Sequence, residues 1–382
     1  MRLRFLLPVL PLLAAPIVIR AANVVVTHVG TPPAAQTAID HAAGIWGGIL
    51  ESTVDIKVRV LWFPLGGTTL GITFPNGRRD FAGAPLQQTW YASALANSIA
   101  GTELNPGESD MDVYLNGGTN WYLGTDGLPA PGQHDLATVA LHEMGHGLGF
   151  VGLSKKVAGQ GSLGLLQMAD FAPLTTSFPW PQLDTLPGVF DVFLSDQQDG
   201  PLVMMPNPGT QLGDAMTGNQ LHFNGPLVMA ANGGAGARMY APSTFALGSS
   251  CVHFNESTFP PGNPNELMTP FSSTGDANHW PGPLCLALMQ DIGWLLAPDV
   301  GLEERSAAAA AHVWPNPVAD VLHVRLPGLR PGDVLRIVDG TGRTVGRGAY
   351  GDPLSVGELA PGVYLLVFGT GGAGVRFIRA RS

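Results

Sequence analysis

The stretch between Asp135 and Phe150 restricts the fold of this chain more than any other part of its sequence. It reads Asp-Leu-Ala-Thr-Val-Ala-Leu-His-Glu-Met-Gly-His-Gly-Leu-Gly-Phe. An aspartate that can cap a helix, apolar residues at helical spacing and glycines at the far end predict a helix here. Residues four apart on a helix lie about 40° apart around the axis and about 6 Å apart along it. The imidazoles of His142 and His146 can therefore reach one metal ion.

Glu143 directly follows the first of these histidines, on a neighbouring part of the helix surface. It is badly placed as a third ligand and well placed to hold a water on the metal, as the glutamate does in His-Glu-x-x-His zinc peptidases. A helix whose histidines merely fill a polar edge is the alternative, and Gly149 and Phe150, which extend the motif, count against it. A catalytic zinc usually takes three protein ligands and leaves one position for water. A third ligand is therefore expected elsewhere in the chain.

Many metzincin peptidases place that ligand three residues after the glycine that here is Gly149. Gly152 occupies this position and cannot bind a metal. Farther along the chain, His253 is followed by Glu-Leu-Met-Thr-Pro and by an apolar stretch that ends Gln-Asp-Ile-Gly-Trp. His222 and Glu256 are the rival third ligands.

This order of motifs resembles leishmanolysin, a metzincin in which a long insertion separates the helix from the third histidine. The resemblance implies that His253 is the third ligand and that Met268, in the Glu-Leu-Met-Thr-Pro turn, lies beneath the metal. It implies an α+β fold over residues 23–297, with a mixed twisted sheet, an active-site helix and a closing helix. The insertion covers residues 153–250.

The sequence before the predicted helix alternates between strand and helix patterns. β-branched and alternating runs predict strands at residues 23–29, 56–62 and 70–74, and apolar residues at helical spacing predict a helix at 34–50. The next alternating stretch is similar to the strand that borders the cleft in metzincins and pairs with an extended peptide. An ordinary strand inside the sheet is the alternative. The residues of this predicted substrate edge strand are Met111, Asp112, Val113, Tyr114 and Leu115.

The chain has two cysteines. Cys251 lies just before His253, and Cys285 begins the predicted closing helix. An exported protein can keep disulfides, so we expect a bridge that ties the loop of the third ligand to this helix. Two buried free thiols are the first alternative, and a thiolate zinc ligand is a more distant one.

The first residues predict export. Arg2 and Arg4 precede a short apolar run that prolines interrupt and small residues follow, so residues 1–22 are interpreted as a secretory signal peptide and not as a membrane anchor. No later segment is apolar enough to predict a transmembrane helix. The net charge of −10 argues against nucleic acid or an anionic membrane as the partner.

The composition changes after Pro298. The alanine-rich residues 298–312 predict a linker, and residues 313–382 predict a small all-β sandwich of short alternating strands. This last part resembles the C-terminal sorting domain of proteins exported by the bacterial type IX secretion system. The resemblance implies passage through the periplasm and across the outer membrane, with that machinery as a partner.

Together these features predict a secreted zinc endopeptidase that acts on proteins or peptides. One catalytic Zn²⁺ would be held by His142, His146 and His253, with Glu143 as general base. A zinc peptidase with a carboxylate third ligand is one alternative. A secreted adhesin or binding protein that keeps an inactive peptidase fold is the other.

Overall fold

A computed structural model describes residues 21–179, 184–297, 312–325, 329, 332–338, 344–368 and 373–380. The predicted signal peptide, except for its last two residues, and the predicted linker, except for its last residue, lie outside these ranges. The described chain is a mixed α+β protein with several small sheets and few helices. Within it, no helix combines the length and the apolar character needed to cross a membrane.

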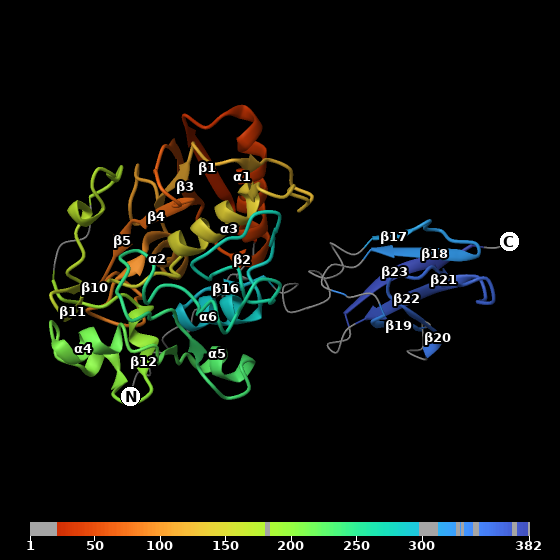
Figure 1. Cartoon of the computed structure of the whole chain (residues 1–382). Helices are drawn as coiled ribbons and strands as arrows, with labels where there is room; N and C mark the ends of the chain where they lie inside the picture. The colour runs from red at the N-terminus through yellow and green to blue at the C-terminus, as the bar shows by residue number, and fades with distance from the viewer. Residues whose placement is uncertain are drawn as a thin grey trace, which may run out of the picture.

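The largest sheet of the first part has four strands in the order β1-β3-β7-β4, which are β1 (Val24–Val29), β3 (Ile56–Phe63), β7 (Met111–Asn116) and β4 (Gly71–Pro75) (Figure 1). The first three strands are parallel, and β4 is antiparallel to β7. Alternating β-branched residues favour strands in which one face is buried, and β3 alternates in this way. The strands predicted in these regions are confirmed.

The predicted edge strand is an interior strand. β3 and β4 pair with β7 on both sides, and all six residues of β7 are buried. The prediction that Met111–Leu115 borders the cleft is therefore wrong, and the strand at this edge of the sheet is β4.

Two helices lie against each other beside this sheet, α1 (Pro33–Ile49) and α3 (Leu136–Gly147) (Figure 1). A proline in the first turn favours the start of α1, and apolar residues every three or four positions give it one buried face. Trp46 on this face is fully buried, and its Nε1 donates a hydrogen bond to the carbonyl oxygen of Leu141, 2.9 Å away. This bond fixes α3 against α1.

The closing helix predicted before Trp294 is α6 (Pro283–Ile292). The remaining short elements outside the insertion connect the main ones. Three pairs of short strands are among them: β2 (Leu50–Glu51) pairs with β16 (Leu295–Leu296), β5 (Gly77–Arg78) pairs with β6 (Tyr91–Ala92), and β8 (Trp121–Tyr122) pairs with β9 (His134–Asp135). The remaining one is the helix α2 (Ser93–Ala100).

The insertion folds into small elements of its own. A hairpin of β10 (Ser154–Val157) and β11 (Gln160–Leu163) is followed by a four-stranded sheet in the order β13-β12-β14-β15. The remaining bounds are η1 (Met168–Phe171), η2 (Asp191–Phe193), β12 (Leu194–Asp196), β13 (Gly200–Pro201), η3 (Leu202–Met204), α4 (Thr210–Ala215), β14 (Leu221–Phe223), α5 (Pro226–Ala231) and β15 (Ala237–Arg238).

The described residues of the C-terminal part form strands and their connections, as predicted. One sheet has the order β17-β18-β21 and the other β20-β19-β22-β23, and residues from both sheets form one hydrophobic core. The strands are β17 (His312–Trp314), β18 (Val321–Arg325), β19 (Val334–Val338), β20 (Thr344–Ala349), β21 (Leu354–Ser355), β22 (Gly362–Phe368) and β23 (Ala373–Arg379).

Candidate metal centre

Helix α3 begins where the sequence predicts. Asp135 is its N-cap, and Oδ1 of this residue accepts a hydrogen bond from the backbone N–H of Thr138 at 2.7 Å. Oδ1 also lies 2.8 Å from Nε2 of His279. This cap satisfies one of the free N–H groups at the start of the helix and fixes the rotation of the turns that follow.

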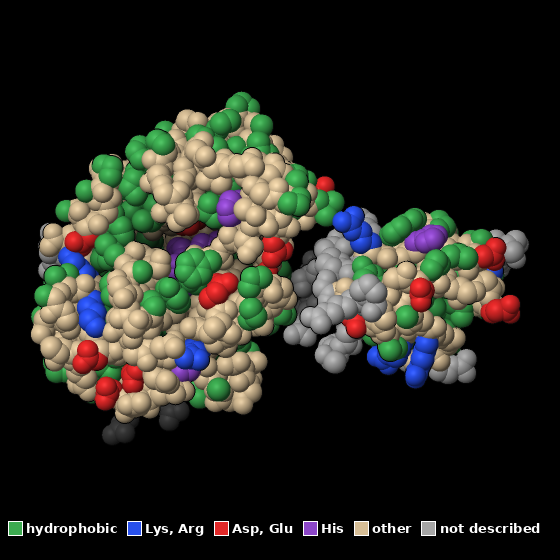
Figure 2. Space-filling model, in the orientation of Figure 1, with side chains coloured by type: hydrophobic (Ala, Val, Ile, Leu, Met, Phe, Trp, Pro, Cys, Tyr) green, Lys and Arg blue, Asp and Glu red, His purple; other side chains and the backbone are tan. Residues whose placement is uncertain are grey.

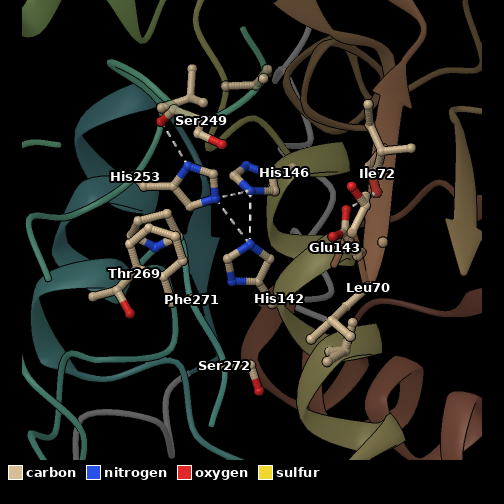
Figure 3. Close-up of a pocket in the computed structure, with 18 of the residues that line it drawn as sticks. Leu70, Ile72, His142, Glu143, His146, Ser249, His253, Thr269, Phe271 and Ser272 are labelled. Carbon is tan, nitrogen blue, oxygen red and sulfur yellow. Dashed lines mark hydrogen bonds between the residues drawn. The ribbon is translucent and has the colours of Figure 1, made fainter. Parts of the chain in front are cut away.

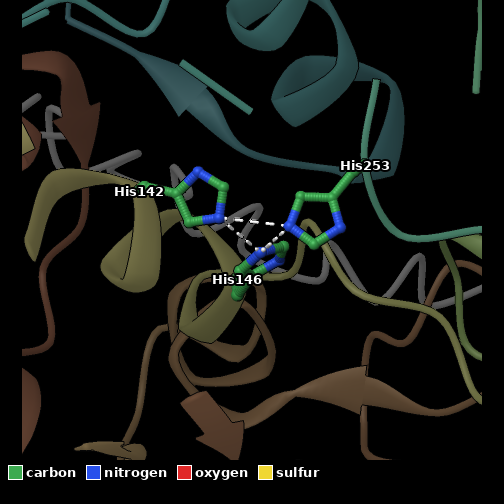
Figure 4. Close-up of side chains that lie close together, drawn as sticks. All are labelled: His142, His146 and His253. Carbon is green, nitrogen blue, oxygen red and sulfur yellow. Dashed lines mark hydrogen bonds between the residues drawn. The ribbon is translucent and has the colours of Figure 1, made fainter. Parts of the chain in front are cut away.

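Three histidines from two distant segments converge at one point. Nε2 of His142 lies 3.0 Å from Nε2 of His146 and 3.2 Å from Nε2 of His253. The third pair, His146 and His253, is 3.1 Å apart between the same atoms, across 107 residues of the chain. Figures 3 and 4 show the three rings pointing toward one another.

The other ring nitrogen of each histidine contacts a backbone carbonyl oxygen. Nδ1 of His142 lies 2.6 Å from O of Leu267, and Nδ1 of His146 lies 2.7 Å from O of Phe150. Nδ1 of His253 lies 2.9 Å from O of Ser249. Since a carbonyl oxygen only accepts, each Nδ1 carries the hydrogen, and in the neutral ring each Nε2 keeps its lone pair.

Neutral rings are the expected state, because the site is buried. Burial lowers the pKa of His142, and burial together with repulsion from His142 lowers the pKa of His253 to about 3. Burial, with the same kind of repulsion from its two neighbours, puts the pKa of His146 well below its usual value. Three lone pairs therefore face one another at short range, which is unfavourable unless a cation lies between them.

The distances fit a metal ion. Three nitrogens bound at about 2.0–2.1 Å to one tetrahedral zinc lie about 3.3–3.4 Å apart, slightly more than in this structure. The carbonyl contacts supply the outer-shell hydrogen bonds that orient ligand histidines. His142, His146 and His253 thus form a group that can hold one metal ion.

Glu143 lies beside this group and points to the opposite wall. It is only 5% exposed, and Oγ1 of Thr73 on β4 donates a hydrogen bond to its Oε2 at 2.8 Å. Figure 3 shows Glu143 between the helix of the histidines and the strand that carries Ile72. Burial raises the pKa of Glu143 to about 8, while the bond from Thr73 lowers it. A nearby metal cation acts in the same direction as that bond.

The loop of Met268 packs against helix α3. Met268 is fully buried, and a Cβ built on Gly145 would lie 3.0 Å from its sulfur. Its carbonyl oxygen accepts a hydrogen bond from the N–H of Phe254 at 2.8 Å. The methionine turn therefore contacts α3 between the two helix ligands and also the segment of His253.

The histidines line a cleft of about 1050 Å³ between β4 and the loops around residues 247–253 and 266–278. Figure 2 shows this hollow with histidine side chains inside it. Its charged lining is acidic: Glu143, Glu256, Glu266 and Asp276 face it, and no Lys or Arg is among the described residues that line it. A cleft of this size admits a chain segment and not only a small molecule.

The rival ligands lie apart from the histidine group. His222 is on β14, where its Nδ1 contacts O of Gln220 at 2.8 Å and its Nε2 lies 3.3 Å from Nε2 of Gln197. Glu256 lines the cleft, but the group that can hold a metal does not include it.

The predicted disulfide is wrong in this structure. Cys251 and Cys285 are both buried and both free. Sγ of Cys251 contacts O of Met216, in the insertion, at 3.8 Å, whereas Cys285 lies in α6. Burial raises the pKa of both thiols, so neither is poised as a nucleophile.

Sequence reasoning missed Thr73 and the cleft position of β4. A strand was predicted at residues 70–74, but a threonine in a strand carries no signal that its hydroxyl meets a carboxylate 70 residues away. No protein-family model matches the chain, and no curated protein and no solved structure matches it.

Proposed function

We propose that this chain is a zinc-dependent endopeptidase, as the likeness of its motifs to leishmanolysin also suggests. One observation carries the proposal. Three neutral imidazoles, 3.0 to 3.2 Å apart at Nε2, lie beside a buried carboxylate in a large open cleft. Ligation by three histidines suits zinc and leaves a coordination position free.

His142, His146 and His253 would hold the zinc, which would supply Lewis-acid chemistry to polarise a carbonyl and to make water more acidic. Glu143 carries out the proton transfers. Its carboxylate oxygen takes a proton from the attacking water and returns a proton to the leaving amine. Thr73 holds Oε2 of this carboxylate, and the neighbouring histidines keep their Nε2 lone pairs for the metal.

The substrate is proposed to bind as an extended segment along β4. The N–H of Asn116 bonds to O of Leu70 and the N–H of Asn76 bonds to O of Asp110, so the even-numbered residues of β4 pair with β7. The backbone groups of Gly71 and Thr73, and the carbonyl oxygen of Pro75, then point away from β7, and all three residues line the cleft. Pairing of this kind binds main chain and demands little of the side-chain sequence.

The test is cleavage of an unfolded protein by the full zinc-loaded chain. Activity should disappear with a zinc chelator and return with added zinc. Glu143→Gln should bind zinc normally and lose roughly 100-fold or more of its turnover. Loss of zinc from that variant would show that the role given to Glu143 is wrong. A folded, zinc-loaded chain that cleaves nothing would favour the adhesin or binding-protein alternative.

We propose export separately, from residues 1–22 and from the likeness of residues 313–382 to type IX sorting domains. A strain with a type IX secretion system should release the full chain to its surface or medium. A chain that ends before residue 313 should stay in the periplasm, and release of that shorter chain would refute the proposal.

A further inference from the structure

Strand β4 does more than border the cleft, because Thr73 bonds to one oxygen of the Glu143 carboxylate and Gly71 leaves room for the rest of that side chain. Residues Gly71 and Thr73 are two apart, so their side-chain positions face the same side of the sheet. That side faces α3. Oγ1 of Thr73 donates to Oε2 of Glu143 at 2.8 Å.

Gly71 provides the room that this contact needs. A Cβ built there would lie 2.6 Å from Oε1 of Glu143 and 2.7 Å from Cδ and Cγ. Real Cβ atoms essentially never approach a heavy atom this closely, so any larger residue would displace the carboxylate. The three atoms in the way all belong to the side chain of Glu143 and none to backbone. A substitution at Gly71 should therefore move Glu143 without unfolding the strand.

The strand itself is held firmly. Thr73 is paired with Val113 of the interior strand β7, and Phe74, the next residue, is buried in a cluster with Tyr114 and Phe178. The side chain of a β-branched residue on such a strand has little freedom about χ1. The hydroxyl of Thr73 is thus a donor of fixed position, and it bonds to Glu143, a longer side chain with more rotatable bonds.

From this geometry we propose that Thr73 is a positioning residue for the general base Glu143, and that Gly71 leaves free the space that the Glu143 carboxylate occupies. The inference rests on the proposed peptidase function. A carboxylate that must face a water and then an amine needs a fixed orientation, since small displacements of a catalytic group lower the rate steeply. The hydroxyl of Thr73 fixes one oxygen and leaves the other free for the proton.

The first experiment compares Thr73→Val and Thr73→Ser with the wild type in the full zinc-loaded chain. Valine keeps the shape and removes the donor, so kcat should fall about 10- to 100-fold, the usual range for outer-shell partners. KM should stay within about twofold, because the hydroxyl serves the transition state and not substrate binding. Serine restores the donor and should recover most of kcat.

Zinc affinity, measured by competition with a chelator, should be unchanged in both variants, because Thr73 touches no metal ligand. Thr27→Val is the matched control. Thr27 is an exposed strand residue on β1, at the other edge of the same sheet, and its substitution should change neither kcat nor zinc affinity.

The second experiment uses Gly71→Ala, with Gly44→Ala as its control. A Cβ at Gly44 on α1 would meet nothing within 4 Å, so that variant should behave as wild type. Gly71→Ala should fold and bind zinc normally, yet lose kcat at least as strongly as Thr73→Val.

The outcomes separate the two proposals. If the wild type cleaves and Glu143→Gln does not, but Thr73→Val retains wild-type kcat, the positioning role is refuted and the peptidase remains. A fall in kcat that serine does not recover, or one accompanied by loss of zinc, refutes it equally. If the zinc-loaded wild type cleaves nothing, both proposals fail together.

Discussion

Replacement of His253 by alanine should remove most of the stabilisation that zinc gives to the fold. Zinc at 100 times its Kd stabilises a protein by about 2.7 kcal/mol through mass action. For domains of about 150–250 residues, the size class nearest to residues 23–297, each kcal/mol shifts the melting temperature by about 2–4 °C. The wild type should therefore melt about 5–11 °C higher with zinc than with a chelator.

The size of the loss follows from the ligand set. Four-ligand zinc sites bind with about 10–16 kcal/mol, which gives about 3 kcal/mol for each ligand. His253 is one of three ligands, so His253→Ala should raise Kd about 100-fold. The same zinc concentration is then close to Kd, the stabilisation falls to about 0.4 kcal/mol, and the shift falls to about 1–2 °C.

The assay is a thermal melt of each variant with zinc and with a chelator. Only the zinc-induced shift is compared, because alanine at a buried position also lowers the baseline by leaving a cavity. His222→Ala is the control, since His222 lies outside the histidine group and should keep the full shift. A full shift in His253→Ala, or its loss in His222→Ala, would refute the assignment of the third ligand.

Three further predictions concern the same region. Asp135→Ala removes the cap of α3 and should lower the free energy of unfolding by about 1–2 kcal/mol, measured by urea titration. In the metal-free protein, burial and His142 hold the pKa of His253 at about 3, below its ordinary 6.5. As the pH falls, the unfolded chain binds a proton on this histidine before the folded chain does. The free energy of unfolding should therefore fall between about pH 6.5 and pH 3, by up to about 1.4 kcal/mol per pH unit. A rise of that free energy in this window would contradict the burial of the ring. Both cysteines are free and buried. Without reductant, a thiol reagent should therefore modify both cysteines in the denatured protein and should react only slowly with either in the folded protein. If fewer than two thiols react after denaturation, the cysteines form a disulfide.

The sequence predicts the elements whose signals are local. The start of α3 follows from Asp135 and the apolar spacing behind it, and α1 and β3 follow from their periodicity. The paired orientation of His142 and His146 follows from helix geometry alone. For these features the tertiary structure adds packing partners but changes no assignment.

Strand order is not local, which is why the edge was misplaced. Alternation in residues 111–115 shows that the stretch is a strand, yet it says nothing about which strands lie next to it. In the structure the polar members are buried too, and Asp112 accepts hydrogen bonds from Arg59 at 2.8 and 2.9 Å. An ion pair inside the sheet makes the pattern of an interior strand look like that of an exposed edge.

The disulfide prediction was wrong for a related reason, because a position near a motif does not fix the direction of a thiol. Cys251 has a left-handed backbone with φ of 71°, and its thiol contacts Met216 of the insertion. Disulfide formation requires a narrow range of Cβ separations and directions that sequence does not reveal.

The insertion also explains how a ligand so distant in sequence reaches α3. The N–H of Tyr240 bonds to O of His253, the N–H of Cys251 bonds to O of Tyr240, and Met239 forms a bridge with Phe254. The segment of His253 therefore runs antiparallel to the chain that leaves β15 and is bound to it by an isolated bridge and these hydrogen bonds. Loop-closure entropy grows only slowly with loop length, so the long separation itself costs little once this sheet is folded. The insertion is thus part of the scaffold of the metal centre, since it fixes the backbone on both sides of the third ligand.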